Sequence, residues 1–276
     1  MLPFRRILFP IDFSERCRGA AQHVELFTGR FDAELIALHV AQPIAGVGHA
    51  FEQERLQRFL PKDFEQFSVR YVVAEGSPGP YISRFAKEND INLIMMPTHG
   101  VGAFRRMLMG SVTAQVLHDA ECPVWTGTHA EETPPVDRLH CQEIICALDA
   151  RPADFPVLMA AEQLAREFGG QLTLVHGVQV PAVQSDVVVS PAGAEYLAEC
   201  MEEARQELKR MVREANSRAQ ICVGAGRPAH VLREAAKCRK ADLMVLGRSQ
   251  ATGALGRLRA DAYSIICGSP CPVLSI

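Results

Sequence analysis

Short apolar runs alternate along the chain with longer amphipathic stretches. In the first half, the runs that have the length of buried parallel strands are 6–12, 34–40, 69–74, 92–96 and 122–126. Between them the pattern predicts a helix capped by Ser14 and stopped by a left-handed Gly29, a charged helix over 51–59, a helix that begins at Pro78 and a helix capped by Ser111. This alternation of strand and helix predicts an α/β fold with a parallel sheet, because right-handed crossovers place helices on both of its faces.

The second half repeats the pattern of the first. The matching positions are Asp12 with Asp149, His39 with His176, Gly76 with Gly226 and Cys122 with Cys271. The first two pairs are 137 residues apart and the last two 150 and 149, so about 13 extra residues lie in 179–190 or in the helix after Pro191. The chain is therefore predicted to be an internal duplication.

The duplication predicts two domains, at 1–128 and 141–276, each an open parallel five-stranded sheet with helices on both faces. Residues 129–140 contain two glutamates and two prolines, which are typical of an exposed linker. The last apolar runs of the halves, 124–126 and 273–275, are expected to be sheet edges that pair the two halves into an intramolecular pseudo-dimer. Further dimerisation of the whole chain stays open.

Composition narrows the class of protein. Of the 276 residues, 48% are hydrophobic and 22% charged, and the net charge is -3 with both signs mixed along the chain, which argues against a general nucleic-acid binder. We expect no membrane span and no signal peptide, because no apolar run is long enough and the first residues lead directly into a strand. A cytoplasmic location and reduced, buried thiols follow as expectations for the nine cysteines, of which Cys146, Cys222 and Cys267 lie in apolar patterns.

Candidate chemistry gathers in the stretch 96–111, where a strand leads through a glycine-bearing loop into a helix. Gly100 and Gly110 allow the backbone to approach a phosphate, and Ser111 offers a hydroxyl at the positive end of the helix. Arg105 and Arg106 add positive charge. A plain tight connection between strand and helix is an equally good interpretation of this loop taken alone.

Two further positions end strands at the same edge of the predicted sheet. Asp12 ends the first strand and can bind a ribose hydroxyl or a base edge, while the backbone around Val40 can meet a purine. The alternative for Asp12 is a residue that only caps the following helix.

Several short motifs resemble those of the universal stress protein family. They are Pro10-Ile11-Asp12-Phe13-Ser14, Leu38-His39-Val40, Glu75-Gly76, Thr98-His99-Gly100, Gly110-Ser111 and Cys122-Pro123-Val124. The resemblance extends over both halves, so the chain is similar to a tandem member. It implies a Rossmann-like fold of the adenine nucleotide alpha hydrolase type.

ATP-binding members of that family carry the motif G-x-x-G-x9-G-[ST] after the fourth strand. In the first half this register falls on Pro97, Gly100, Gly110 and Ser111, so proline replaces the first glycine and removes one N–H. The resemblance therefore implies that ATP, with Mg²⁺ on its phosphates, is the cofactor. The implied binding residues are Asp12, Val40, Pro97, His99, Gly100, Gly110, Ser111 and Val112.

The same register in the second half keeps only its first glycine. It reads Gly247, Gln250, Ala260 and Asp261, and a carboxylate stands where a phosphate would lie. Arg248, Arg257 and Arg259 can offset that charge or can be solvated loop residues. We expect the second site to be empty or to bind something other than ATP.

Histidines and cysteines outside the motif are expected to be structural. His39 and His176 occupy matching strand ends and are interpreted as satisfied core residues, since no metal-ligand spacing accompanies them. His99 can contact phosphate or shape the loop. Cys122 and Cys271 each precede proline at a strand start and are expected to pack rather than react.

Three functions remain after this reasoning. The first is a nucleotide-binding protein of stress response or signalling, and the second is a dimeric interaction module that has lost nucleotide binding. The third, a slow ATPase or an adenylating enzyme, is the least supported, because neither a phosphate loop after the first strand nor a P-loop motif is present in the sequence.

Overall fold

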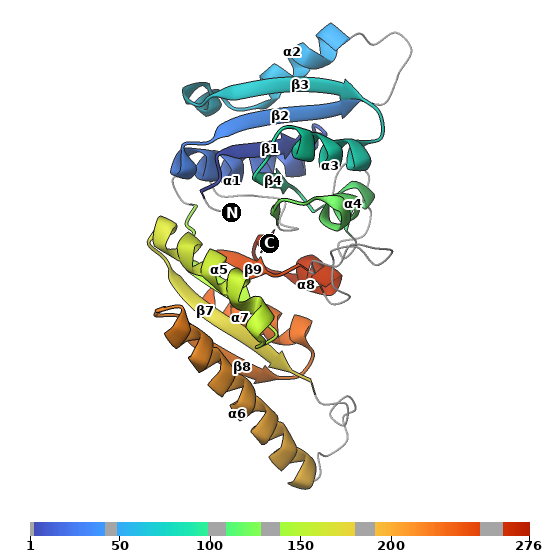
Figure 1. Cartoon of the computed structure of the whole chain (residues 1–276). Coiled ribbons are helices and arrows are strands. Elements are labelled where there is room, and N and C mark those ends of the chain that lie inside the picture. The colour runs from blue at the N-terminus through green and yellow to red at the C-terminus, as the bar shows by residue number, and fades with distance from the viewer. Residues whose placement is uncertain (1–2, 42–48, 99–108, 128–138, 180–190, 249–261) are drawn as a thin grey trace. The chain divides into compact units, whose positions relative to one another are not determined.

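The computed structural model describes residues 3–41, 49–98, 109–127, 139–179, 191–248 and 262–276. The chain divides into two compact units, one formed mainly by Met1–Leu139 and the other mainly by His140–Arg248 and Arg259–Leu274. Each unit contains a five-stranded sheet with helices packed on it (Figure 1). The prediction of an α/β fold built twice is confirmed.

The first unit follows the predicted alternation of strands and helices. Its elements are β1 (Arg6–Pro10), α1 (Glu15–Phe31), β2 (Glu34–Ala41), α2 (His49–Phe59), η1 (Lys62–Gln66), β3 (Val69–Glu75), α3 (Pro78–Glu88), β4 (Leu93–Met96), α4 (Ser111–Asp119) and β5 (Val124–Thr126). The strand order is β3-β2-β1-β4-β5, and every pair is parallel. The chain first moves outward from β1 to β3 and then returns to β4, so the order reverses between β1 and β4.

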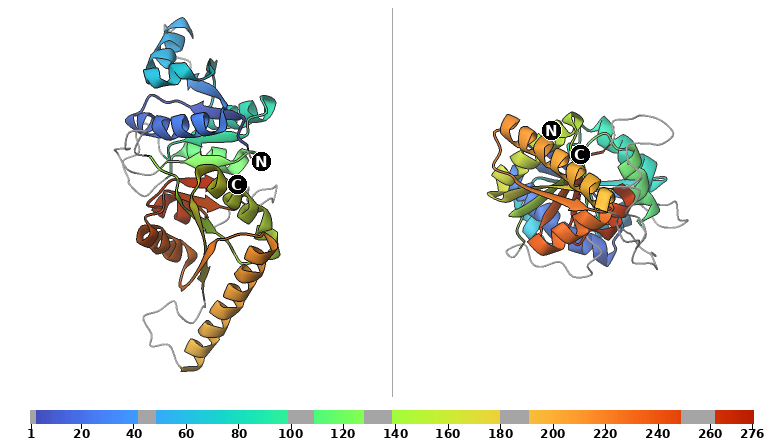
Figure 2. Two further views of the ribbon diagram at one scale, coloured as in Figure 1. Left: turned by 90° about the vertical axis from the view of Figure 1, so that its left-hand side faces the viewer. Right: turned by 90° about the horizontal axis from the view of Figure 1, so that it is seen from below.

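The second unit has the same order, β8-β7-β6-β9-β10. Its elements are β6 (Glu143–Ala147), η3 (Pro152–Asp154), α5 (Phe155–Phe168), β7 (Gln171–Val178), α6 (Pro191–Glu214), β8 (Gln220–Ala225), α7 (Pro228–Arg239), β9 (Leu243–Leu246), α8 (Ala262–Gly268) and β10 (Val273–Ser275). The extra residues of this repeat lie mostly in α6, which has 24 residues where α2 has 11. Figure 2 shows the first turns of α6 extending beyond the strands that it covers.

Several strands of the first unit are almost fully buried. Three of the five strands of the first unit, β1, β4 and β5, have no exposed residue apart from Arg6 at the start of β1. Leu8 and Ile94, which pair across β1 and β4, are both 0% exposed. Such continuous apolar runs form when helices cover both faces of a parallel sheet, which is why the sequence shows runs rather than alternation.

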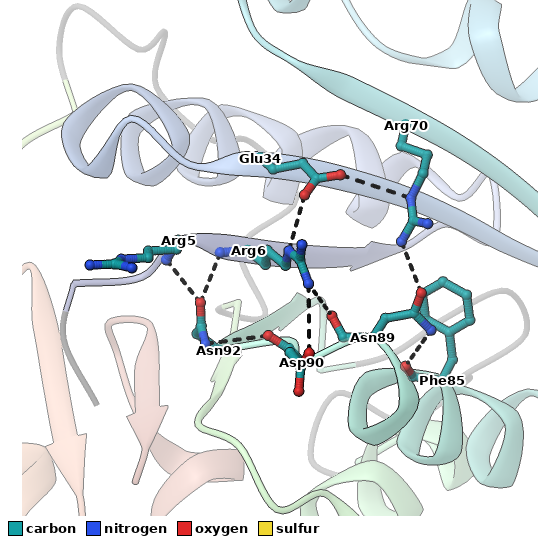
Figure 3. A network of polar contacts seen from close by, with 8 residues as sticks. All are labelled: Arg5, Arg6, Glu34, Arg70, Phe85, Asn89, Asp90 and Asn92. Carbon is teal, nitrogen blue, oxygen red and sulfur yellow. Dashed lines mark hydrogen bonds and ion pairs between the residues drawn. The ribbon is translucent and has the colours of Figure 1, made fainter.

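Polar contacts hold the amino-terminal edge of the first sheet together (Figure 3). The side-chain oxygen of Asn92 accepts hydrogen bonds from the backbone N–H groups of Arg5 and Arg6, each over 2.9 Å. In the second unit Asp242 accepts two such bonds, from Gln142 and Glu143, also over 2.9 Å. The same device therefore fixes both sheets at the edge opposite to the carboxyl ends of the strands.

Two predicted helix boundaries are wrong. Helix α1 does not stop at Gly29 but continues to a left-handed Asp32 (φ 49°), and this extension brings Phe31 against Phe4 with ring centroids 5.1 Å apart. Packing of Phe31 on the buried Phe4 outweighs the preference for a glycine stop. Helix α4 begins one residue earlier than expected, because Gly110 and not Ser111 occupies the N-cap.

Candidate functional site

The candidate site lies at the carboxyl ends of three adjacent strands of the first unit. Asp12 follows β1, Val40 lies near the end of β2, and Pro97 directly follows β4. Strand β1 is hydrogen-bonded to both β2 and β4, so all three positions share one edge of the sheet. Ligands of open α/β sheets bind at such an edge where the strand order reverses, which here is between β1 and β4.

Asp12 begins the turn that leads into α1. One of its carboxylate oxygens accepts a hydrogen bond from the backbone N–H of Ser14 over 3.0 Å, and Ser14 in turn caps the helix by accepting from the N–H of Cys17 over 3.2 Å. The structural role that the sequence offered as an alternative is thus present. A carboxylate has about four acceptor positions, so the hydrogen bond to Ser14 does not by itself exclude a ligand from Asp12.

The backbone N–H and C=O of Val40 point toward the side of β2 on which β1 lies, beyond the last residue of β1. The carbonyl of Leu38 accepts from the N–H of Ile11 over 2.8 Å, whereas the carbonyl of Ala41 accepts from the N–H of Gly76 over 3.1 Å on the other side. Backbone groups alternate in direction along a strand, so the N–H and C=O of Val40 point toward the β1 side. That strand ends at Pro10, which leaves the edge of β2 open beside Asp12.

Two hydrogen bonds join the ends of the candidate phosphate loop. The N–H of Gly110 donates to the carbonyl of Thr98 over 2.9 Å, and the buried hydroxyl of Thr113 donates to the carbonyl of Pro97 over 3.0 Å. The loop therefore leaves β4 and enters α4 at nearly the same point. His99 and Gly100, with Arg105 and Arg106, lie outside the described residues.

The first turn of α4 has the features of an anion site. Its N-cap, Gly110, makes no side-chain capping bond, so the orphan N–H groups of this turn receive no acceptor from that residue. Ser111 is exposed and Val112 is half-buried. Uncapped N–H groups at a helix N-terminus favour negatively charged ligands.

The matched histidines have the structural role that the sequence analysis preferred. His39 Nδ1 lies 2.7 Å from the carbonyl oxygen of Ile11, and His176 Nδ1 lies 2.8 Å from that of Leu148. Each ring thus ties the second strand of its unit to the residue after the first strand. Among the described residues, no group of three or more potential ligands is placed to hold a metal ion.

The second unit is built differently at the same edge. Gly177 occupies the position of Val40 and pairs with Gly224 on β8. A Cβ atom on Gly177 would lie 2.8 Å from the Cα of Pro228, and one on Gly224 would lie 2.7 Å from a methyl group of Val231. Helix α7 therefore packs directly on the strand positions that correspond to Val40 and its neighbour.

The first motif position also differs between the repeats in size. A Cβ on Gly247 would lie 2.9 Å from a methyl group of Val157 on α5. In the first repeat, the corresponding residues are Pro97 and the buried Ala20. The first repeat thus has the larger residue after the strand and the smaller one on the helix, and the second repeat has the reverse. Gln250, Ala260 and Asp261, with Arg257 and Arg259, lie outside the described residues, whereas Arg248 is buried.

The thiols follow the expectation only in part. Cys17, Cys141 and Cys146 are buried, and burial raises the pKa of each thiol well above its usual value. Burial also raises the pKa of Cys271 to about 11, which favours the unreactive thiol expected there. Cys222 and Cys267, expected to be buried, are partly exposed.

Sequence comparison decides the family. A model of the universal stress protein family matches residues 3–126 and again residues 141–276. The chain belongs to the universal stress protein family. It is a tandem member, with one family domain in each half.

Known relatives agree with this membership. The universal stress protein MJ0531 of Methanocaldococcus jannaschii is 31% identical over 137 residues, which cover 44% of this chain and 80% of that protein. A structure of the functionally unknown protein PA1789 of Pseudomonas aeruginosa aligns over 99% of this chain and 92% of its own, with a TM-score of 0.73 and 17% identity. A universal stress protein structure from Archaeoglobus fulgidus aligns over 98% and 97%, with a TM-score of 0.71 and 19% identity. At these identities the two structures establish the shared fold alone.

Sequence reasoning missed two residues of this candidate site. Thr113 closes the loop, and the only signal for it is a hydroxyl residue two positions after the Gly-Ser pair. Phe13 adopts a left-handed backbone conformation (φ 62°) directly after Asp12, and Ala150 does so (φ 56°) at the matching position of the second unit. The residue types at these positions do not predict this conformation, because neither phenylalanine nor alanine favours it.

Among the described helices, none is long and apolar enough to cross a membrane.

Proposed function

We propose that the first unit binds ATP, with Mg²⁺ on its phosphates, at the carboxyl ends of β1, β2 and β4. In this proposal Asp12 accepts a ribose hydroxyl and the backbone of Val40 meets the edge of the adenine. The triphosphate lies on the turn that begins α4. The contacts proposed for it come from Pro97, His99, Gly100, Gly110, Ser111 and Val112.

The observation that carries the proposal is the common edge. A carboxylate, an open strand backbone and a helix N-terminus whose cap residue is a glycine follow three adjacent parallel strands at the point where the strand order reverses. These are the acceptor, the base-reading edge and the anion-binding turn that a nucleotide needs.

Pro97 fits the loop as a framing residue rather than as a donor. It has no N–H to offer a phosphate, and its carbonyl accepts the hydroxyl of Thr113. We propose that the phosphates are held by the N–H groups that remain, above all those of the first turn of α4. Affinity should then be lower than for a loop with glycine at this position.

The second unit is proposed not to bind ATP. The backbone of Pro228 lies against Gly177, where the first unit has Val40, so α7 approaches the strand on which the first unit presents its base-reading edge. Asp261 adds a carboxylate at the position of the phosphate-binding serine. One ATP per chain is therefore the expected stoichiometry.

A role in stress response or signalling, in the cytoplasm, completes the proposal, with nucleotide occupancy as the signal. The alternative, an interaction module that no longer binds nucleotide, is favoured by the presence of Pro97 in the motif. Pairing of the two halves as a pseudo-dimer through 124–126 and 273–275 stays a prediction, as does dimerisation of the chain.

Purified protein tests the proposal directly. After denaturation, released nucleotide is identified by absorbance and chromatography, and protein freed of nucleotide is then titrated with ATP and Mg²⁺. ATP in the released fraction, or saturable uptake, supports the proposal. Neither release nor uptake would favour the interaction module.

A further inference from the structure

A compact group of side chains from α2 and β2 surrounds the strained residue beside Asp12. The Phe13 ring lies against His39, with centroids 4.5 Å apart, and edge-on against Phe59, with centroids 5.5 Å apart. The guanidinium carbon of Arg55 lies 3.8 Å from the centroid of the same ring. Three side chains thus hold a phenylalanine whose backbone is in the left-handed region.

The same group also fixes the residue before Asp12. His39 Nδ1 contacts the carbonyl of Ile11 at 2.7 Å, and its other nitrogen lies 3.7 Å from Glu52. Glu52, which is mostly buried, lies 3.5 Å from Arg55 and so joins the two arms of the group. The backbone on both sides of Asp12 is therefore held by side chains from β2 and α2, His39 before it and His39, Arg55 and Phe59 after it.

The second unit keeps the backbone of this turn but not the ring. Ala150 has the same left-handed conformation as Phe13, and His176 makes the same contact as His39. A methyl group offers no face for a cation. The aromatic clamp is therefore not needed to form the turn, and it occurs in the unit proposed to bind nucleotide.

A bulky residue with positive φ costs conformational energy and persists where the surroundings enforce it, commonly at ligand sites. We propose that Arg55, acting through Phe13, is a positioning residue that holds the Asp12 carboxylate toward the ribose hydroxyls of the nucleotide. This inference rests on the proposed function, because it assigns Asp12 to the ribose. Arg55 acts in this proposal through its contact with the Phe13 ring.

Two ligands separate positioning from general stability. ATP and 2′,3′-dideoxy-ATP differ only in the ribose hydroxyls, so the ratio of their affinities measures what Asp12 contributes. We expect wild-type protein to prefer ATP by about tenfold, because a hydrogen bond to a charged group is lost with the dideoxy ligand. Arg55→Ala should reduce this ratio about fivefold, whereas Arg55→Lys, which keeps a cation over the ring, should restore most of it.

Arg58→Ala is the matched control, because Arg58 lies one turn away on α2 and pairs only with the exposed Glu54 among the described contacts. Its affinity ratio should equal that of the wild type. A merely structural role of Arg55 would lower the affinities for both ligands equally and leave the ratio unchanged.

Hydrogen exchange tests the clamp without any nucleotide. The N–H of Ser14 donates to Asp12, so a looser Asp12 should raise the exchange rate of that amide about fivefold in Arg55→Ala but not in Arg58→Ala. Faster exchange together with a reduced ratio supports the proposal. An unchanged exchange rate, or an unchanged ratio, overturns it. Failure of the wild type to bind ATP at all contradicts the proposed function instead, and the exchange rate then still decides whether Arg55 holds Asp12.

Discussion

The hydroxyl of Thr113 donates a hydrogen bond to the carbonyl of Pro97 over 3.0 Å, joining the first turn of α4 to the end of β4. Both residues are buried, so the bond is protected from water. This contact closes the loop that carries the proposed phosphate site. It does so without a phosphate contact of its own, because the Thr113 hydroxyl is used in this bond and Pro97 has no N–H. The geometry of the site therefore depends on a hydroxyl that does not belong to the motif.

Replacing Thr113 by valine should weaken nucleotide binding without a direct contact to the ligand. The substitution keeps the shape but leaves the carbonyl of Pro97 buried without its donor, which costs about 1–3 kcal/mol. Thr28→Val is the control, because the Thr28 hydroxyl is also buried and donates to the carbonyl of Val24 over 2.7 Å, far along the chain from the loop. Denaturant unfolding should show a smaller loss for Thr28→Val, because the carbonyl of Val24 keeps the helical N–H of Thr28 as a donor, while calorimetric titration with ATP should show weaker binding for Thr113→Val alone.

Pro97 and Ala20 in the first repeat correspond to Gly247 and Val157 in the second, so the larger residue changes sides. This exchange predicts an energetic coupling between Pro97 and Ala20. Ala20→Val alone should overpack the space beside Pro97 and destabilise the unit by about 1–3 kcal/mol. Combining it with Pro97→Gly recreates the pair Val157 and Gly247 of the second repeat and should recover about 1 kcal/mol or more of that loss. A double-mutant cycle by urea unfolding measures the coupling; strictly additive losses would mean that the two positions do not share this space.

Pro97→Gly also restores the N–H that the motif has lost. ATP should bind the variant about tenfold more tightly, a gain of about 1.4 kcal/mol that corresponds to one added hydrogen bond to a phosphate. Pro97→Ala provides the same N–H with less backbone freedom and separates the two effects. If both variants bind as the wild type does, position 97 makes no contact with the ligand.

Helix α7 should be sensitive to any side chain at Gly177. A methyl group there would lie 2.8 Å from the backbone of Pro228, which cannot move aside as a flexible side chain would. Gly177→Ala should therefore cost about 1–3 kcal/mol of unfolding free energy. Gly268→Ala is the control, since nothing lies within 4 Å of a Cβ at that position. Equal stability of the two variants would show that α7 does not press on β7.

Burial of His23 predicts a pH dependence of stability in the first unit. Its ring lies against Trp125, with centroids 4.9 Å apart, and burial lowers its pKa from 6.5 to about 4. Between these values the unfolded chain binds a proton that the folded chain does not, so stability falls as pH decreases, by up to about 3 kcal/mol. Unfolding followed by the fluorescence of Trp125, the single tryptophan, should show this loss, and His23→Leu should reduce it. A variant with the full wild-type loss would place the titration on other groups.

The fold could be predicted from the sequence because its signals are local and repeated. Buried parallel strands appear as continuous apolar runs. The recurrence of Asp, His, Gly and Cys-Pro at matching positions of the two halves indicated the duplication. Helix ends were less predictable: Asp32 replaces Gly29 as the stop because the packing of Phe31 on Phe4, distant in sequence, decides it.

The site could be predicted only where the backbone and the motif coincide. Asp12, Val40 and Pro97 meet at one edge because parallel strands must align their carboxyl ends. Phe13 and its contact with Arg55 could not be anticipated, since a left-handed backbone at phenylalanine and a cation–π contact with α2 depend on tertiary packing. The same holds for Gly177, whose importance comes from the approach of α7.

Calorimetric titration of ATP and Mg²⁺ into the whole chain, compared with Gly110→Val and Gly110→Ala, tests the central claim most directly. A single phosphate site at the start of α4 predicts one ATP per wild-type chain. Gly110→Val should lose that site, because a β-branched side chain fills the space of a phosphate, and Gly110→Ala should keep partial binding. Two equivalent ATP molecules per chain, or unchanged binding in Gly110→Val, would contradict it.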